Sequence, residues 1–242
     1  MPAKPKNPPP HWGADPLTEY FDKYRDNQYA TFHNKKLAVG DLIAIDKLFL
    51  KFLKEIKKPE PIFPIGFIFR AHGAYRAAVG AIMAGQLYES QALMRLCIEH
   101  GAYALYIGDD MERWGLWMSR NDSESSKDKV KREFTQRKVI KCIKSKSRRI
   151  AEIYVQLYDQ LIDFGAHPNE MGYSMSTEIC EEVGETHIDS IYLHENGFQL
   201  DFALKTVAQI GIWVLLAAQL IYSARFDLLG IKHSLNQIGQ RY

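Results

Sequence analysis

The sequence predicts an all-α protein, a multi-helix bundle with a small β-hairpin near residues 186–200. Three observations favour this fold class. Apolar residues recur at three- and four-residue spacing along most of the chain. The composition, with 46% hydrophobic and 25% charged residues, is that of a globular domain, and one short segment alone is rich in β-branched residues. At 242 residues, the chain can bury a core without a metal or a disulfide.

The first sixteen residues contain six prolines. Proline at this density does not propagate a helix, because each ring removes a backbone donor. We therefore expect an extended arm over residues 1–16 and a single helical domain over residues 17–242. The arm lacks the apolar run of a secretory signal, and the three cysteines stand far apart, so we expect free thiols in a cytoplasmic protein.

The next segment predicts four helices. Apolar spacing indicates helices over 37–56 and 68–86, separated by a proline-rich connector. A third helix over 87–107 ends at a glycine, and a short helix over 111–118 follows. Small residues recur every four positions in the second helix, which predicts the close approach of another helix there (Gly73, Ala77, Ala81 and Gly85).

Residues 130–164 follow helical spacing, as one helix or as two joined near Ser145–Ser147. Thr186–Leu193 is rich in β-branched and aromatic residues, and the turn signal Asn196-Gly197 follows it, which predicts the hairpin. A long helix then runs from about Asp201 to Leu229.

Thr206–Ala224 contains no charged residue, and its length is close to the roughly 20 residues that span a bilayer. Gln209 and Gln219 lie inside it. We expect a buried central helix and no transmembrane segment, because a helix surrounded by other helices is apolar on every side. The same surface could instead form a homodimer interface.

The charge is divided along the chain. Lys127–Arg149 holds eleven Lys or Arg and two acidic residues, a local charge of +9, whereas the whole chain carries only +2. Such a segment favours RNA or DNA as a partner, since it would neutralise several phosphates. An anionic lipid surface, an acidic protein or a merely solvated helix face would fit the same charge. The candidate nucleic-acid-binding residues are Lys129, Arg132, Arg137, Lys138, Lys141, Lys144 and Arg148.

Candidate catalytic residues are Arg95, Glu99, His100 and His167. Arg95 and Glu99 stand four residues apart, so they share one face of a helix and can pair, either to orient the helix or to line an anion-binding pocket. His100 and His167 could transfer protons near neutral pH, although His167 could instead cap a helix end. No nucleotide-binding, hydrolase or zinc motif is present, so we expect no cofactor and no metal.

The segments MRLCIEHGAYALYI and YDQLIDFGAHPN resemble a group of uncharacterised bacterial helical proteins allied to the HEPN-like bundles, over about residues 68–170. The shared features are Arg95 with Glu99, and Tyr158 and Leu161 with His167 and Pro168. The resemblance implies an all-α bundle. The wider superfamily includes metal-independent ribonucleases, whose signature is an arginine followed four to six residues later by a histidine. Arg95 and His100 fit that spacing, whereas no arginine precedes His167 at it.

Three functions are therefore expected from the sequence. The first is a non-catalytic, nucleic-acid-associated protein of defence or toxin–antitoxin type that docks through the basic segment. The second is a metal-independent ribonuclease of HEPN-like type. The third is a homodimeric interaction protein. The second requires Arg95, Glu99 and a histidine to converge on one open site.

Overall fold

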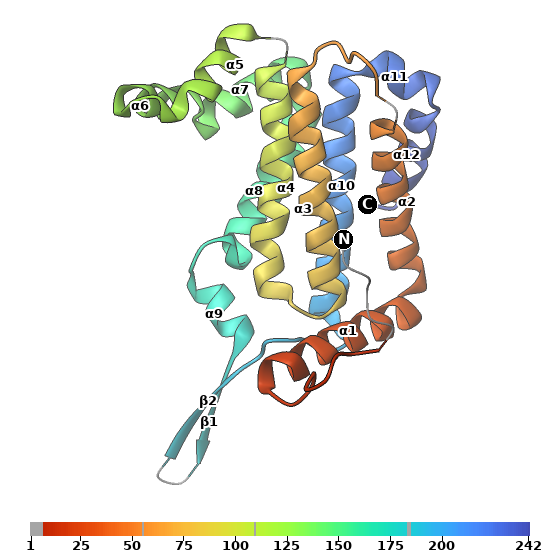
Figure 1. Cartoon of the computed structure of the whole chain (residues 1–242), viewed down its shortest axis with the longest axis vertical. Helices are drawn as coiled ribbons and strands as arrows, with labels where there is room; N and C mark the ends of the chain where they lie inside the picture. The colour runs from red at the N-terminus through yellow and green to blue at the C-terminus, as the bar shows by residue number, and fades with distance from the viewer. Residues whose placement is uncertain (1–6, 55, 109, 183–184) are drawn as a thin grey trace.

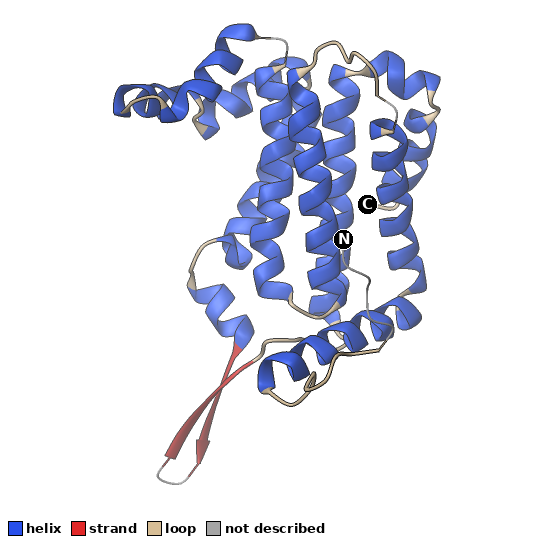
Figure 2. Ribbon diagram, in the orientation of Figure 1, coloured by secondary structure: helices blue, strands red, loops and turns tan. Residues whose placement is uncertain are grey.

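The computed structural model describes residues 7–54, 56–108, 110–182 and 185–242. Long helices run side by side along the main axis of a bundle (Figure 1). They are α2 (Lys36–Leu53), α3 (Phe63–Met83), α4 (Leu87–Ile107), α8 (Arg148–Leu161) and α10 (Phe198–Ile221). A two-stranded antiparallel hairpin projects from one end (Figure 2). The predicted fold class, an all-α bundle with a small hairpin, is confirmed.

The remaining elements cover the ends and flanks of the bundle. They are α1 (Pro16–Asn34), α5 (Met111–Met118), the 3-10 turn η1 (Ser119–Asn121), α6 (Glu124–Glu133), α7 (Gln136–Lys146), the π-helical turn η2 (Ile162–Ala166), α9 (Glu170–Ser176), β1 (Thr177–Glu182), β2 (Glu185–Ser190), α11 (Ser223–Leu228) and α12 (Ile231–Gly239). The helices predicted over 87–107 and 111–118 have the expected bounds. α1 lies in a part of the chain for which no individual helix was predicted.

Helix α10 lies in the core and packs against α2, α3, α4 and α8. It is long and apolar enough to cross a membrane, but 67% of its most apolar window is buried inside the bundle. Trp213 is 1% exposed, and its indole Nε1 donates to the carbonyl of Ile150 at 2.9 Å. The apolar side chains of this helix are already buried within one chain, which leaves little of this surface for a second copy.

Close helix approach occurs at other glycines than expected. Gly73 and Ala77 are exposed, and a Cβ added at Gly73 would meet nothing within 4 Å. By contrast, a Cβ at Gly211 would lie 2.6 Å from the ring of Tyr75, and one at Gly101 would lie 3.0 Å from Trp213. Only half of the every-fourth-residue stripe is thus exposed. Ala81 is buried, and a Cβ at Gly85 would lie 2.2 Å from the backbone oxygen of His194, while the rest of the buried face of α3 carries Tyr75 and its neighbouring alanines.

Residues 130–164 form parts of three helices rather than one or two. Thr135 and Ser147 interrupt the helical run, and each accepts a hydrogen bond from a backbone N–H three residues later, as N-cap residues do. α6, α7 and α8 therefore start at separate caps.

The hairpin lies earlier in the chain than expected. Its strands pair Thr177 with Ser190 and Ile179 with Ile188, so only the second strand overlaps the predicted one. The Asn196-Gly197 pair does not turn a hairpin, because Gly197 is the N-cap of α10. Just before it, the backbone N–H of His194 donates to the carbonyl of Gly85 at 2.8 Å, which fixes this connection to the α3–α4 corner.

Of the predicted extended arm, residues 1–6 lie outside the described residues. Residues 9–14 form a turn, held by the Trp12 N–H, which donates to the carbonyl of Pro9. The Trp12 ring stacks on Phe21, and its indole N–H donates to Asp22 at 3.0 Å. Asp15 then caps α1. The described part of the arm is therefore folded back on α1, because one aromatic side chain has a partner there.

Candidate functional site

Arg95 and Glu99 form the predicted pair on α4. Arg95 Nε donates to Glu99 Oε1 at 2.9 Å, and the two side chains are 23% and 33% exposed. Tyr158, on α8, donates its hydroxyl to the same Glu99 oxygen at 3.2 Å. The guanidinium also lies over the Tyr158 ring, 5.4 Å from its centroid. Two helices thus hold the guanidinium by its inner nitrogen and one face.

His167 completes the cluster from beyond the end of α8. Its Nε2 contacts the terminal nitrogen NH1 of Arg95. An arginine side chain only donates hydrogen bonds, so Nε2 accepts here and the ring proton of a neutral imidazole resides on Nδ1. Arg95, Glu99, Tyr158 and His167 are hereafter the Arg95 cluster.

The π-helical turn η2 and α9 place His167. Gly165 has a φ of +121°, which a glycine adopts without strain, and this turns the chain out of the helix. Asn169 then caps α9 and donates to the carbonyl of Ile162 at 2.6 Å. His167 is the C-cap residue of η2, as the helix-end alternative expects, and its side chain also contacts Arg95.

Tyr88, at the start of α4, fits against two glycines of this segment. A Cβ at Gly165 would lie 2.4 Å from the Tyr88 ring, and one at Gly172 would lie 2.3 Å from it. The segment that carries His167 is therefore packed against α4, the helix that carries Arg95 and Glu99. Sequence reasoning missed Tyr88, Gly165, Asn169 and Gly172. The closely spaced Gly165 and Asn169 could have indicated a fixed turn.

The structure does not bring His100 into the Arg95 cluster. Its Nδ1 contacts the carbonyl of Leu96 at 2.7 Å, and its ring lies beside Phe67 with centroids 6.3 Å apart. Adjacent residues on a helix point about 100° apart, so His100 faces away from the side that carries Glu99. The arginine–histidine pairing is thus made across helices, by Arg95 and His167.

The pKa values of Arg95 and Tyr158 are both shifted by their surroundings. Burial opposes the charge of Arg95, but the hydrogen bond and charge of Glu99 outweigh it, so the pKa of Arg95 is raised. Burial, aided by Glu99, raises the pKa of Tyr158. At neutral pH the cluster therefore offers a guanidinium cation, a phenol that keeps its proton and an imidazole. Glu99 offsets the charge of Arg95, so long-range attraction of an anion must come from elsewhere.

The basic segment supplies that charge. Seven side chains of this segment are exposed and make no salt bridge to a described carboxylate. Arg149 stands at the start of α8, and the other six lie on α6 and α7: Lys129, Arg132, Arg137, Lys141, Lys144 and Lys146. We call these six the basic surface. Of the residues predicted to bind nucleic acid, Lys138 pairs with Glu133 at 2.6 Å and Arg148 pairs with Glu152 at 2.8 Å. Five of the seven predicted residues are thus in the basic surface.

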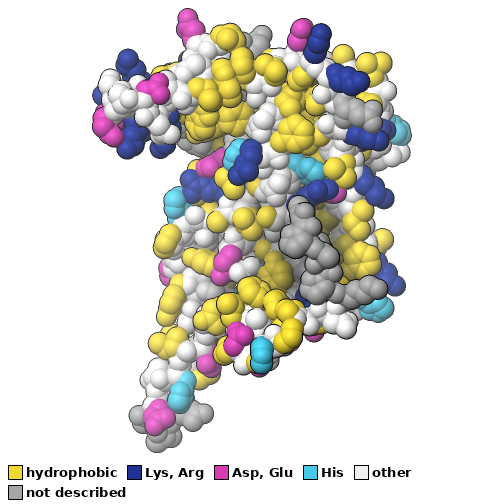
Figure 3. All heavy atoms as spheres, viewed as in Figure 1, with side chains coloured by type: hydrophobic (Ala, Val, Ile, Leu, Met, Phe, Trp, Pro, Cys, Tyr) yellow, Lys and Arg dark blue, Asp and Glu magenta, His cyan; other side chains and the backbone are white. Residues whose placement is uncertain are grey.

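Helices α6 and α7 carry the basic surface, and α6 projects away from the bundle (Figure 1). Lys and Arg side chains surround its exposed end (Figure 3). Phe134, at the end of α6, packs among aromatic side chains. Its ring centroid lies 5.0 Å from that of Trp117 and 5.5 Å from those of Tyr103 and Tyr106. The Tyr106 hydroxyl also donates to Glu133 at 2.6 Å. The end of α6 is therefore packed against α4.

Comparison with protein-family models, curated proteins and solved structures finds no match for this chain. Within the described part of the chain, no group of three or more His, Cys, Asp or Glu side chains could hold a metal ion. Cys97, Cys142 and Cys180 are free thiols. The chemical features that remain are the Arg95 cluster and the basic surface.

Proposed function

We propose that this protein binds nucleic acid through the basic surface of α6 and α7. The observation that carries the proposal is a single face of α7. Arg137, Lys141 and Lys144 stand at positions i, i+4 and i+7, and all three are exposed without a carboxylate partner. Val139 and Ile143, on the opposite face, are buried in the bundle. This row of cations is thus fixed in place by the core.

A phosphate backbone is the ligand that such a row fits best. The successive residues of the row rise about 6 and about 4.5 Å along the helix, so the row spans about three phosphates of a strand at roughly 3.4 Å each. Carboxylates pair with Lys138 and Arg148 beside the row but leave its members free. Binding should be strongly salt-dependent, because each neutralised phosphate releases counterions.

The test is filter binding of labelled single-stranded RNA and duplex DNA at several salt concentrations. The triple variant Arg137→Glu, Lys141→Glu, Lys144→Glu should bind at least tenfold more weakly. It should also reduce the magnitude of the log–log salt slope by about 2 for single strands. The matched control, Lys23→Glu, Lys47→Glu, Lys51→Glu, changes three exposed lysines of α1 and α2 by the same total charge. It should bind much as the unaltered chain does.

Equal loss in the two triple variants would mean that net charge alone drives the binding, and would overturn the proposal. So would retention of anionic vesicles, but not of RNA or DNA, by the unaltered protein.

A second function, metal-independent cleavage of RNA, is favoured by one specific observation. Arg95 and His167, which lie 72 positions apart in the sequence, touch in the folded chain, with Tyr158 and Glu99 around them. Glu99 accepts from Nε of Arg95 and His167 accepts from NH1, so the remaining N–H groups of NH1 and NH2 are those that would bind a phosphate. Arginine binds phosphate oxygens through such paired N–H groups.

In this reaction the ribose 2′-hydroxyl replaces Arg95 as the donor to Nε2 of His167. Nε2 accepts the hydroxyl proton, and the 2′-oxygen attacks the adjacent phosphorus. A 2′-O–P bond forms, and the P–O5′ bond breaks. The 5′-oxygen leaves with a proton from solvent, which gives a 2′,3′-cyclic phosphate and a 5′-hydroxyl. Arg95 stabilises the charge on the non-bridging phosphate oxygens.

The experiment incubates RNA with purified protein in excess chelator and follows the cyclic phosphate. His167→Gln and Arg95→Lys should each lower the rate at least a hundredfold, since both groups act in the transition state. His100→Gln, a change outside the Arg95 cluster, is the matched control and should leave the rate unaltered. RNA that stays intact with the unaltered protein, or equal losses from His100→Gln and His167→Gln, would contradict this function.

A further inference from the structure

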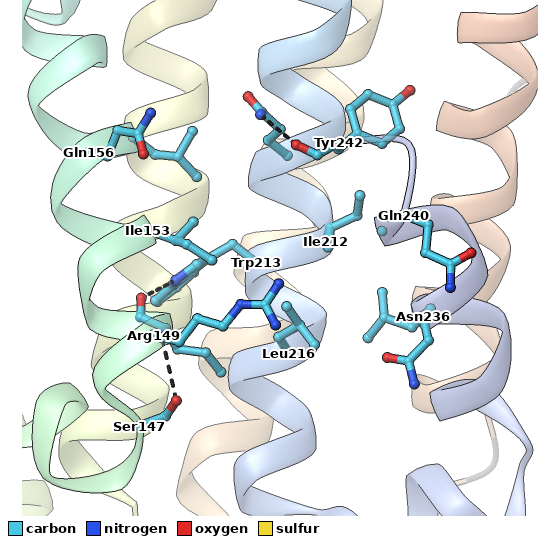
Figure 4. A pocket seen from close by; sticks show the side chains of 15 residues that line it. Ser147, Arg149, Ile153, Gln156, Ile212, Trp213, Leu216, Asn236, Gln240 and Tyr242 are labelled. Atoms are coloured by element: carbon cyan, nitrogen blue, oxygen red, sulfur yellow. Dashed lines mark hydrogen bonds between the residues drawn. The ribbon is translucent and has the colours of Figure 1, made fainter.

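A cavity lies away from both the Arg95 cluster and the basic surface. It occupies about 660 Å³ between α8, α10 and α12 (Figure 4). Helix α10 packs against both α8 and α12 and forms the floor, whereas the other two helices form the walls. Pockets for small ligands typically measure about 300–1,000 Å³, so this one is large enough for a whole ligand.

The floor of the cavity is apolar. Trp213 and Leu235 are each 1% exposed, and Ile212 is 8% exposed. Ile153 and Leu216 extend the same surface. The indole N–H of Trp213 is already bonded to the carbonyl of Ile150, so that ring offers the cavity an apolar face.

The rim is polar, and its one formal side-chain charge is Arg149. The side chain of Arg149 is exposed and extends from α8 across α10, in front of Leu216 (Figure 4). No salt bridge joins it to a described carboxylate, and no Asp or Glu is among the lining residues. The adjacent Arg148, in contrast, pairs with Glu152. Gln156, Asn236 and Gln240 are uncharged donors and acceptors around the same opening.

We propose that this cavity binds an amphipathic small molecule with one acidic head group, such as a medium-chain carboxylate or alkyl phosphate. The apolar body lies on Trp213, Ile212 and Leu216, and the acidic head lies against the guanidinium of Arg149. An apolar pocket with a few convergent polar groups is the usual form of a ligand site. A guanidinium free of other partners supplies a two-pronged contact for a carboxylate or phosphate.

This assignment differs from the nucleic-acid proposal, because a ligand held in the cavity contacts none of the six residues of the basic surface. It favours an acidic over a cationic head group, since Arg149 is the one charged side chain among the lining residues. Neutral apolar molecules could occupy the floor but would leave Arg149 without its contact.

The test is isothermal titration calorimetry of the full chain with decanoate, decyl phosphate and decyltrimethylammonium, all below their micelle concentrations. The first two probes distinguish the kinds of acidic head, and the third keeps the chain but reverses the charge. Decanoate or decyl phosphate should bind with one site. Arg149→Gln should weaken that binding at least tenfold, whereas Arg148→Gln, the matched neighbour outside the cavity, should not change it.

Leu216→Trp should reduce binding by filling the cavity. Because Leu216 packs against the core, its folding is checked by circular dichroism, and Arg149→Gln remains decisive since that side chain is exposed. Equal binding of the cationic probe, unchanged affinity in Arg149→Gln, or no binding of either acidic probe would overturn the assignment.

Discussion

At Gly165 the chain leaves the line of α8 and returns toward α4, so a residue without a side chain decides where His167 can lie. The Tyr88 ring occupies the space on the outer side of that turn. The contact between Arg95 and His167 thus depends on a positive φ and on ring packing as much as on charge. Neither Gly165 nor Tyr88 carries the chemistry of the cluster, but both determine its geometry.

Replacing Gly165 with alanine should destabilise the fold by about 1–3 kcal/mol, because alanine is strained at positive φ. The added Cβ would also lie 2.4 Å from Tyr88. Urea denaturation measures the loss. Gly73→Ala is the control: it lies inside α3 in open space and should stabilise by about 0.5–1 kcal/mol. A Gly165 variant as stable as the unaltered chain would show that the turn tolerates a side chain.

The Arg95–Glu99 pair could be predicted from the sequence because a helix repeats every 3.6 residues, and the spacing alone places both side chains on one face. The contact with His167 could not be predicted in this way. It depends on how α8 packs beside α4, and no local period encodes that. His100 was favoured by the arginine–histidine spacing of the HEPN-like ribonucleases, and the helix places it beside Phe67 instead.

Between elements, α2 and α3 are joined by a polar group inside an apolar interface. Asp46 of α2 accepts from Arg76 Nε at 2.7 Å and Arg76 NH2 at 3.0 Å, and it lies 2.7 Å from His72 Nε2. The imidazole of His72 is 7% exposed and stacks on Phe49. His72 is thus a core histidine with a hydrogen-bond partner. One carboxylate thus orients two side chains of the neighbouring helix.

This arrangement predicts a loss of stability in mild acid. Burial lowers the pKa of His72, although the bond to Asp46 partly opposes the shift. The folded state therefore binds fewer protons than the unfolded chain, and stability falls as the pH drops from about 7 to 5, by at most about 1.4 kcal/mol per pH unit for one proton. His72→Gln should make the free energy of unfolding depend less on pH. Urea denaturation at each pH measures this.

The exposed His187→Gln on the hairpin is the control and should leave the slope as it is. His194, whose pKa burial also lowers, should account for part of the slope that remains. A slope unaltered by His72→Gln would refute the linkage. Below about pH 4 a further loss is expected, because the hydrogen bonds from Arg76, with help from His72, hold the pKa of Asp46 below its usual value.

Helix positions could be predicted best where apolar periodicity is strong and the ends carry clear signals. The helix over 87–107 is such a case, ending at Gly108 with a φ of +53°. Between 130 and 164 the apolar spacing continues past Thr135 and Ser147. Periodicity alone therefore could not reveal that these two residues are N-caps that begin new helices. The hairpin was displaced because Asn196-Gly197 is a strong turn signal, yet here it leads into a helix.

For the molecule as a whole, α10 is the element around which the others assemble. It contacts helices from both ends of the chain and places Trp213 at their centre. Its most apolar stretch has the length and hydropathy of a membrane span, yet 67% of that stretch is buried inside the bundle. A helix at the centre of a core is apolar on every side for the same reason.

Gly211→Ala should therefore weaken the entire bundle. The new Cβ would lie 2.6 Å from Tyr75 and 2.8 Å from Ile45, and such overpacking costs about 1–3 kcal/mol. The melting temperature should fall by about 2–10 °C, with far- and near-ultraviolet circular dichroism changing together. Gly66→Ala, in open space on α3, is the control. An undiminished melting temperature would mean that α10 and α3 can move apart freely.

The order of the chain has a consequence for synthesis. Arg95 and Glu99 come first, the basic surface follows, and Tyr158 and His167 come last. A growing chain therefore contains the basic surface before it contains His167, whose imidazole completes the Arg95 cluster. Since α10, which closes the core, follows later still, the Arg95 cluster can reach its final geometry only after most of the protein has left the ribosome. Under the proposed functions, an unfinished chain would attract RNA before it has a complete site to act on it.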